Sequence, residues 1–184
     1  MSLTVSQRRR HQIQSKGFSL PELLIVIVIA GLFSSIAITA GVNQWQREQI
    51  NKLAIELSGW LETVRRAALR GEACSVTLVT GTLSGGSTLA TATCPSDEDD
   101  PPPPDPPPLL VENLGSNINL TVASSSEEAI TFSPRGTRSG EDVTVTLTLN
   151  PSGKQRCVTI SGLLAMINPG QVTETGTCQP NERF

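Results

Sequence analysis

The sequence predicts an α+β protein in which a long N-terminal helix, half transmembrane and half amphipathic, packs on a C-terminal antiparallel β-sandwich-like domain. Three features predict it: an uncharged, largely aliphatic run over 23–42, apolar residues recurring every three or four positions over 50–68, and β-branched runs after Gly71. The expected parts, in chain order, are a cleaved leader (1–17), a transmembrane and assembly helix (18–44), its amphipathic continuation (45–71) and an extracytoplasmic β domain (72–184).

The run over 23–42 has the length of a membrane span, because its 20 residues would extend about 30 Å as a helix. The first 17 residues hold four of the 14 basic side chains and no acidic one, a bias that predicts a cytoplasmic N-terminus. The rest of the chain has 10 basic and 17 acidic residues, hence a net charge of −7. We expect a single-pass inner-membrane protein whose C-terminal domain is periplasmic, or extracellular within a filament.

Three interpretations of the N-terminal segment are open. It could be an ordinary signal peptide cut after residues 35–37, or an uncleaved membrane anchor, but neither accounts for Pro21 and Glu22 beside the apolar run. The third interpretation is cleavage between Gly17 and Phe18. Pro21 would then lie in the first turn of a helix, where its missing N–H breaks no hydrogen bond, whereas inside a longer helix it would cost about 3 kcal/mol.

The same cut would provide Glu22 with a partner. A free α-amino group at Phe18 has an ordinary pKa of about 7.7–8.0 and is mostly cationic at neutral pH. A carboxylate near the bilayer centre costs about 2.5–3.5 kcal/mol, whereas opposite charges about 4 Å apart attract by roughly 4 kcal/mol at an effective dielectric near 20. Glu22 is therefore predicted to recruit the amine of a neighbouring subunit. The alternative is an interfacial glutamate whose side chain reaches the headgroups.

The segment KGFSLPELL over 16–24, preceded by a short basic leader, resembles the class III signal of type IV prepilins and type II secretion pseudopilins. The resemblance implies cleavage after Gly17 by a prepilin peptidase, which also N-methylates Phe18, and a role for Glu22 in filament assembly. It implies as partners other pilin or pseudopilin subunits, the inner-membrane assembly platform and the lipid bilayer.

The helix is expected to continue past the apolar run, from Phe18 to Arg70, with Gly71 as its stop. Basic residues such as Arg65 and Arg66 avoid the apolar stripe and indicate a solvated face rather than a binding patch. The stripe that would lie on the β domain consists of Ile50, Leu53, Leu57, Trp60, Leu61, Val64 and Ala68.

Short β-branched runs between turn signals predict the β domain. The alternation over 143–149 puts one face in the core, and the turn at 150–153 leads into the next strand as a hairpin, on which Val158 and Ile160 would join that face. The expected strands are 75–80, 88–93, 118–123, 129–133, 143–149 and 157–161.

Four cysteines beyond the apolar run predict two disulfides in an oxidising compartment, with four buried free thiols as the alternative. Three pairings are possible. Sequential pairing would join Cys74 to Cys94 and Cys157 to Cys178, closing loops of about 20 residues worth about 3 kcal/mol each on the chain-entropy model. Cys157 would point away from the core face, where the tail that carries Cys178 could be linked to it.

Residues 95–108, PSDEDDPPPPDPPP, are acidic and then proline-rich. Such a segment is extended and cannot pair as a central strand, so we expect an exposed loop inserted into the β domain. A role as ligand for a proline-recognition groove is the alternative. The acids lack the alternating ligands and the glycine of a calcium loop, so no metal is expected here.

The helix-to-strand junction LETVRRAALRGEACSVTL and the later segments AITFSPRGTRSGEDVTVTLTL and RCVTISG resemble the minor-pilin subfamily that includes secretion pseudopilin H and the FimT-type proteins. The resemblance covers most of 61–162 and rests on the turn at 132–136, the following hairpin and Gly162. It implies a β-sandwich-like domain packed on the helix. Together with the N-terminal signal it favours a structural subunit that primes or caps a type IV pilus or a type II secretion pseudopilus.

Catalysis is not predicted. The only histidine, His11, lies in the leader, so the cleaved chain would have no imidazole for a catalytic triad or a zinc site. No phosphate-binding loop, serine elbow or CxxC motif is present. We therefore expect no enzymatic activity, no cofactor and no metal.

Two other functions stay open, and DNA uptake is the first. Some FimT-type proteins bind DNA through a basic C-terminal tail, but the tail over 169–184 has one arginine against two glutamates, and Leu163 and Leu164 stand where these relatives tend to carry arginines. Arg135 and Arg138, in a glycine-flanked turn, are the candidate phosphate contacts. DNA is not the favoured partner, because an acidic domain binds nucleic acid poorly. The second alternative is an ordinary secreted or membrane-anchored binding protein.

Overall fold

The chain separates into two compact units, Met1–Gly41 and Val42–Phe184. The expected leader over 1–17 lies outside the residues that the structure describes, as do the side chains of 33–40. The described residues of this computed structural model are 19–71, 73–95, 105–111, 114, 117–138 and 140–180.

A single helix, α1, spans Leu20–Ala68 and has 49 residues. The prediction of one helix from 18 to 70 was therefore two residues too long at its C-terminal end, while Ser19 precedes the helix and Phe18 lies outside the described residues. At the C-terminal end the Arg70 N–H donates to the Ala67 carbonyl at 3.0 Å, and the Gly71 N–H donates to the Ala68 carbonyl at 3.4 Å. These i→i+3 bonds tighten the last turn and satisfy carbonyls that have no partner within the helix.

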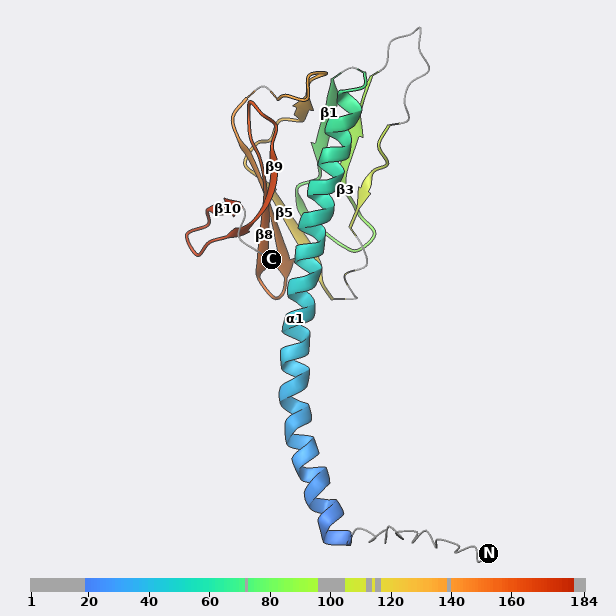
Figure 1. Cartoon of the computed structure of the whole chain (residues 1–184), viewed down its shortest axis with the longest axis vertical. Coiled ribbons are helices and arrows are strands. Elements are labelled where there is room, and N and C mark those ends of the chain that lie inside the picture. The colour runs from blue at the N-terminus through green and yellow to red at the C-terminus, as the bar shows by residue number, and fades with distance from the viewer. Residues whose placement is uncertain are drawn as a thin grey trace, which may run out of the picture. The chain divides into compact units, whose positions relative to one another are not determined.

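The β domain consists of two antiparallel sheets, which confirms the α+β class (Figure 1). The first sheet has four strands in the order β4-β3-β1-β6, and the second has six in the order β10-β9-β8-β7-β5-β2. The strands are β1 (Cys74–Leu78), β2 (Gly81–Leu83), β3 (Thr88–Thr93), β4 (Leu109–Leu110), β5 (Asn119–Ser124), β6 (Ile130–Phe132), β7 (Val143–Asn150), β8 (Lys154–Ile160), β9 (Ile167–Val172) and β10 (Cys178–Pro180).

The second half of α1 buries its apolar stripe in the core shared with both sheets. Leu57 and Leu61 are fully buried, and each such side chain contributes about 1.5–3 kcal/mol by leaving water. All seven residues predicted for the stripe are buried, together with Ala54, which the prediction did not include. Among the residues whose burial is described, the first one in the core is Ile50. The unit Val42–Phe184 therefore contains the whole described core and should fold without residues 1–41.

The predicted hairpin is β7 followed by β8. Val143 pairs with Ile160 and Leu149 pairs with Lys154, and the Gly153 N–H closes the turn by donating to the Leu149 carbonyl at 2.8 Å. Alternate residues of β7 are buried. Val158 and Ile160 are fully buried as well, which confirms the predicted core face.

Four strands were not predicted, namely β2, β4, β9 and β10, and each is short or contains proline or glycine. The strand β9 has Pro169 in its interior, a residue that the sheet rules disfavour. Opposite residues in an antiparallel pair alternate between hydrogen-bonded and non-hydrogen-bonded. The Ser161 N–H donates to the Met166 carbonyl, so three residues further along, the pair of Val158 and Pro169 is a non-hydrogen-bonded one. The nitrogen of Pro169 therefore points away from β8. The pairing of β10 ends at Gly170. The missing N–H of Pro169 therefore removes no ladder bond.

The proline-rich segment lies between β3 and β4, and its residues 96–104 are outside the described part of the chain. Its two ends are held together, since the Cys94 N–H donates to Asp105 Oδ1 at 3.0 Å. The indole of Trp60 on α1 donates to the Pro107 carbonyl at 2.7 Å. These two bonds fix where the segment leaves and rejoins the domain.

Candidate functional site

Hydrogen bonds between Ser19 and Glu22 shape the first turn of α1 and include one half of a capping box. The Ser19 carbonyl accepts hydrogen bonds from the N–H groups of Glu22 at 3.0 Å and Leu23 at 3.1 Å. In return, the Ser19 N–H donates to Glu22 Oε2 at 3.5 Å, which is a long bond. The carboxylate of Glu22 is thus held at the N-terminal end of the helix, where the helix dipole favours a negative charge.

The sequence analysis singled out Glu22 and Pro21 but missed Ser19. The signal was present, since Ser-x-x-Glu before an apolar run is the spacing of a capping box. Pro21 lies in the first turn, where that analysis placed it. Gly17 and Phe18 lie outside the described residues, so cleavage and methylation there stay predictions.

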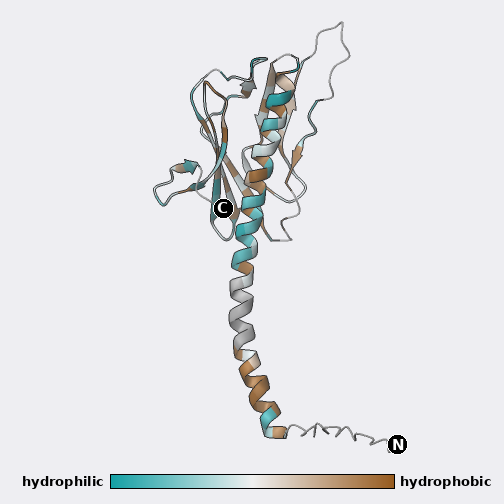
Figure 2. Cartoon of the chain, in the orientation of Figure 1, coloured by the Kyte–Doolittle hydropathy of each residue, from teal (hydrophilic) through white to brown (hydrophobic). Residues whose placement is uncertain are grey.

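Around and after Glu22, from Leu20 to Leu32, the large aliphatic side chains of α1 are all exposed. Figure 2 colours most of this part of the ribbon as hydrophobic. Exposed fractions run from 47% at Ile29 to 76% at Leu20. A helix that is apolar all round requires an apolar environment or partner helices. Among the residues whose side chains are described, no helix combines the length and hydropathy that a membrane span requires. The exposed members are Leu20, Leu23, Leu24, Ile25, Val26, Ile27, Val28, Ile29 and Leu32.

Two disulfides link the cysteines in sequential order. Cys74, at the start of β1, is bonded to Cys94, the residue after β3, with their Cα atoms 4.2 Å apart. The register of β1 and β3 places these two residues opposite each other. This disulfide therefore links β1, the first strand after α1, to the residue directly before the proline-rich segment.

The second disulfide joins Cys157 of β8 to Cys178 of β10 across β9, with a Cα–Cα distance of 5.9 Å. Gly170 lies on β9 between them, paired with Cys157 on one side and with Pro180 on the other. A Cβ atom on Gly170 would approach the Gln179 carbonyl group, whose carbon would be only 2.8 Å away. A glycine at this position allows β10 to lie close enough to β8 for the disulfide.

Arg65 of α1 connects the helix to two turns of the β domain. Its Nε donates to the Gly136 carbonyl at 2.9 Å, and its Nη2 donates to the Leu164 carbonyl at 3.3 Å. Its Nη1 also forms an ion pair with Glu62 at 3.4 Å. The expectation of a solvated face is therefore wrong for Arg65, because its spacing along the helix could not show which carbonyl groups lie opposite, whereas Arg66 is exposed as expected.

The turn over 132–136 forms as the resemblance implied. The Gly136 N–H donates to the Ser133 carbonyl, and the Ser133 N–H donates to the Thr137 carbonyl, both at 2.8 Å. Gly136 has φ of +70°, a conformation that favours glycine. Gly162 has a different reason for lacking a side chain: a Cβ there would run into the Gly140 carbonyl, while its N–H donates to Asp142 Oδ1 at 2.7 Å.

The two arginines proposed as phosphate contacts lie in different environments. Arg135 is exposed. Arg138 is only 9% exposed; its Nη1 donates to the Glu141 carbonyl, and its Nε is buried without a hydrogen-bond partner among the described residues. The carboxylates of Glu128, Glu141 and Asp142 line the same cavity of about 360 Å³ as Arg138. Arg138 therefore does not present its charge for a phosphate, and binding by Arg135 stays a prediction.

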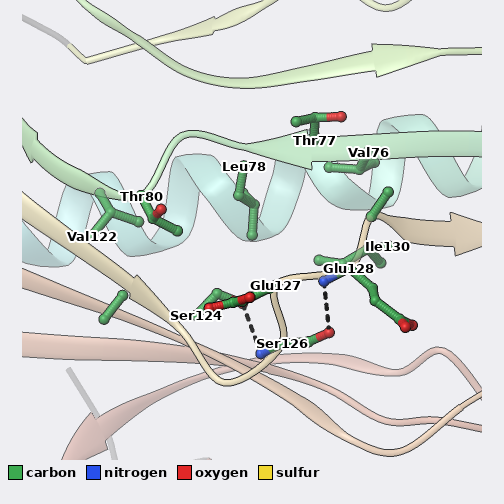
Figure 3. Close-up of a pocket in the computed structure, with 12 residues that line it drawn as sticks. Val76, Thr77, Leu78, Thr80, Val122, Ser124, Ser126, Glu127, Glu128 and Ile130 are labelled. Carbon is green, nitrogen blue, oxygen red and sulfur yellow. Dashed lines mark hydrogen bonds between the residues drawn. The ribbon is translucent and has the colours of Figure 1, made fainter.

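A cavity of about 620 Å³ opens between β1 and the loop that joins β5 to β6 (Figure 3). Leu78 points from β1 toward this loop, beyond the last residue that β6 pairs with. The loop is shaped by hydrogen bonds from the Ser126 N–H to Ser124 Oγ at 3.3 Å and from the Glu128 N–H to Ser126 Oγ at 3.2 Å. Its lining combines aliphatic, hydroxyl and carboxylate groups and includes no histidine, lysine or cysteine.

Two family models match this chain. The model described as the prokaryotic N-terminal methylation motif matches residues 14–38 and so covers the segment KGFSLPELL. The model described as type II transport protein GspH matches residues 53–163, more than half of the chain. No curated protein and no solved structure matches. The chain therefore belongs to the family of type II transport protein GspH, and it is a pilin or pseudopilin of type II secretion or type IV pili.

Proposed function

We propose that this chain is a minor, non-enzymatic subunit that primes or caps a type IV pilus or a type II secretion pseudopilus. The observation that carries the proposal is the exposed aliphatic surface of α1 between Leu23 and Leu32, which directly follows Glu22. That surface is suited first to the inner-membrane bilayer and then to the helices of neighbouring subunits. The match to the N-terminal methylation motif supports the same assignment.

Assembly begins when a prepilin peptidase removes residues 1–17 and methylates Phe18. The amine created there is a cation, and the carboxylate of Glu22 in a neighbouring subunit accepts it. Among the described residues of a single subunit, the partner of the Glu22 carboxylate is the Ser19 N–H at 3.5 Å. An amine at about 4 Å attracts by roughly 4 kcal/mol at an effective dielectric near 20, whereas a neutral hydrogen bond contributes about 1 kcal/mol. The carboxylate therefore favours the neighbour's amine.

The priming or capping role is supported by an apolar surface where α1 ends. Leu163, Leu164 and Met166 are 77%, 60% and 49% exposed, and Leu69, the residue after α1, is 52% exposed. Hydrogen bonds hold this loop, since the Ser161 N–H donates to the Met166 carbonyl at 3.0 Å and Arg65 holds the Leu164 carbonyl. Fixed, exposed leucines mark a contact surface, and we assign it to another subunit of the filament.

Mass spectrometry of the mature N-terminus tests the proposal. A methylated Phe18 is expected, whereas a terminus at Ile38 would indicate ordinary secretion and an intact leader would indicate an uncleaved anchor. The assembly step is tested with Glu22→Gln, which should be processed and stay in the membrane fraction but be lost from sheared filaments. Glu127→Gln is the control, because Glu127 is also an exposed glutamate and lies in the loop between β5 and β6. Normal incorporation of Glu22→Gln would contradict the charge-pairing step.

A further inference from the structure

A second cavity of about 620 Å³ lies on the β domain, beside the part of α1 that follows Val42. One wall is α1 over 44–51. The others are residues 153–156, which are the last residue of the β7–β8 turn and the start of β8, and residues 171–174, from the end of β9 into the loop before β10. We call this cavity the basal groove. All of its lining belongs to the unit Val42–Phe184.

The walls of the basal groove are joined by a polar contact. Nε of Arg156, on β8, donates to Oδ1 of Asn51 on α1. This contact holds β8 against the helix, so that Lys154 at the start of β8 and Arg47 of the helix line the same cavity. Arg47 is exposed and Lys154 is half-buried.

The charge of the basal groove differs in sign from that of the chain around it. Its lining has three cations, Arg47, Lys154 and Arg156, and two carboxylates, Glu48 and Glu174. One carboxylate is engaged, since Glu48 Oε1 accepts a hydrogen bond from Gln44 Nε2 at 3.0 Å. The chain after residue 17 carries −7, so the groove is a local cationic surface on an acidic protein.

The position of the basal groove along α1 indicates which kind of anionic surface these cations contact. Arg47 follows Val42, the end of the apolar run, by five residues, or about 7.5 Å of helix. That rise equals the depth of the headgroup layer, which is about 5–7 Å on each side of a hydrocarbon core of about 30 Å. Trp45 is 42% exposed and lies about 3 Å below Arg47 along the axis. An exposed tryptophan at this level is typical of the membrane interface.

We propose that the basal groove binds the anionic headgroups of the membrane surface and so holds the β domain on the bilayer until the subunit enters the filament. The inference rests on the proposed function, because it places the residues before Val42 in the bilayer. A membrane surface fits better than DNA, since the cations are few, lie beside Trp45 at the end of the apolar run, and belong to a domain that repels long polyanions.

The test uses residues 42–184, which contain the whole described core and both disulfides, and sediments them with vesicles at low salt. Vesicles of phosphatidylcholine with phosphatidylglycerol should bind the domain, and vesicles of phosphatidylcholine alone should not. The double variant Arg47→Gln with Lys154→Gln should partition about 30-fold more weakly, at about tenfold per 1.4 kcal/mol and about 1 kcal/mol per cation. Binding should also weaken as salt is raised.

The matched control is Arg66→Gln with Arg70→Gln, which removes the same charge from two exposed arginines outside the basal groove. It should keep the binding of the parent domain. Three results would overturn the proposal: no binding to anionic vesicles, equal loss in both double variants, or full competition by inorganic phosphate. Groove-dependent binding to a short DNA duplex without vesicle binding would also overturn it, in favour of nucleic acid.

The vesicle experiment is independent of the proposed function. The domain lacks residues 1–41, so leader cleavage and filament entry have no effect on the result. If the domain does not bind anionic vesicles but mass spectrometry finds a methylated Phe18, the headgroup site is rejected and the pilin assignment stands. If the domain binds anionic vesicles but mass spectrometry finds an intact leader, the filament assignment is rejected and the headgroup site stands.

Discussion

Gly170 is the position where one added methyl group tests the packing of the β domain most directly. A Cβ at this residue would lie 2.8 Å from the Gln179 carbonyl carbon and 3.0 Å from the Pro180 Cα, and closer still to the Gln179 oxygen. Ordinary van der Waals contact begins at 3.4 Å, so Gly170→Ala requires β10 to move by about 0.6 Å or more. Because the Cys157–Cys178 bond holds β10 in place, the strand cannot move freely.

We expect Gly170→Ala to lower the free energy of unfolding by about 1–3 kcal/mol, the range for overpacking a well-packed interior. Urea denaturation of residues 42–184, followed by circular dichroism, measures this change. Gly59→Ala is the matched control, since Gly59 lies inside α1 with nothing within 4 Å of the added Cβ. That variant should gain up to about 1 kcal/mol from helix propensity.

A third arm removes the constraint on β10. With Cys157 and Cys178 both changed to serine, β10 is held by its three pairs with β9 and can shift, so the penalty of Gly170→Ala should shrink. The reasoning is refuted if Gly170→Ala, in the disulfide-bonded domain, is as stable as its parent. That result would mean that β10 does not lie against β9 at Gly170.

Two further predictions concern the packing of α1. Leu61→Ala should lower the free energy of unfolding by about 2–5 kcal/mol because the Leu61 side chain is fully buried. Ile55→Ala, at a position 51% exposed, should change it by no more than about 0.5 kcal/mol. Equal losses in urea denaturation would contradict the assignment of the buried face. Arg65→Met should cost about 1.5–3 kcal/mol because the Gly136 and Leu164 carbonyls lose their charged donor. Arg66→Met, at an exposed position, should change the melting temperature little, and a similar shift in both variants would argue against the role given to Arg65.

The pattern of apolar residues along the chain was sufficient to predict those helices and strands that depend only on residues nearby in the sequence. The stripe on α1 and the alternation over 143–149 each follow one period, because side chains on one face recur every 3.6 residues in a helix and every two in a strand. The position of Pro21 likewise placed the start of α1 within two residues. These features depend on neighbours only a few residues apart, so the amino-acid sequence alone determined them.

Long-range contacts decided the remaining features. No local signal distinguished Arg65, which binds two carbonyl groups, from Arg66, or indicated that Arg138 is buried beside Glu141. The pairing of the four cysteines and the strand β9 with its proline depended on which strands lie side by side. The sequence alone determined the helix, its apolar faces and its start near Pro21. The tertiary structure decided which charges are buried and which segments pair, because those contacts join residues up to 105 positions apart.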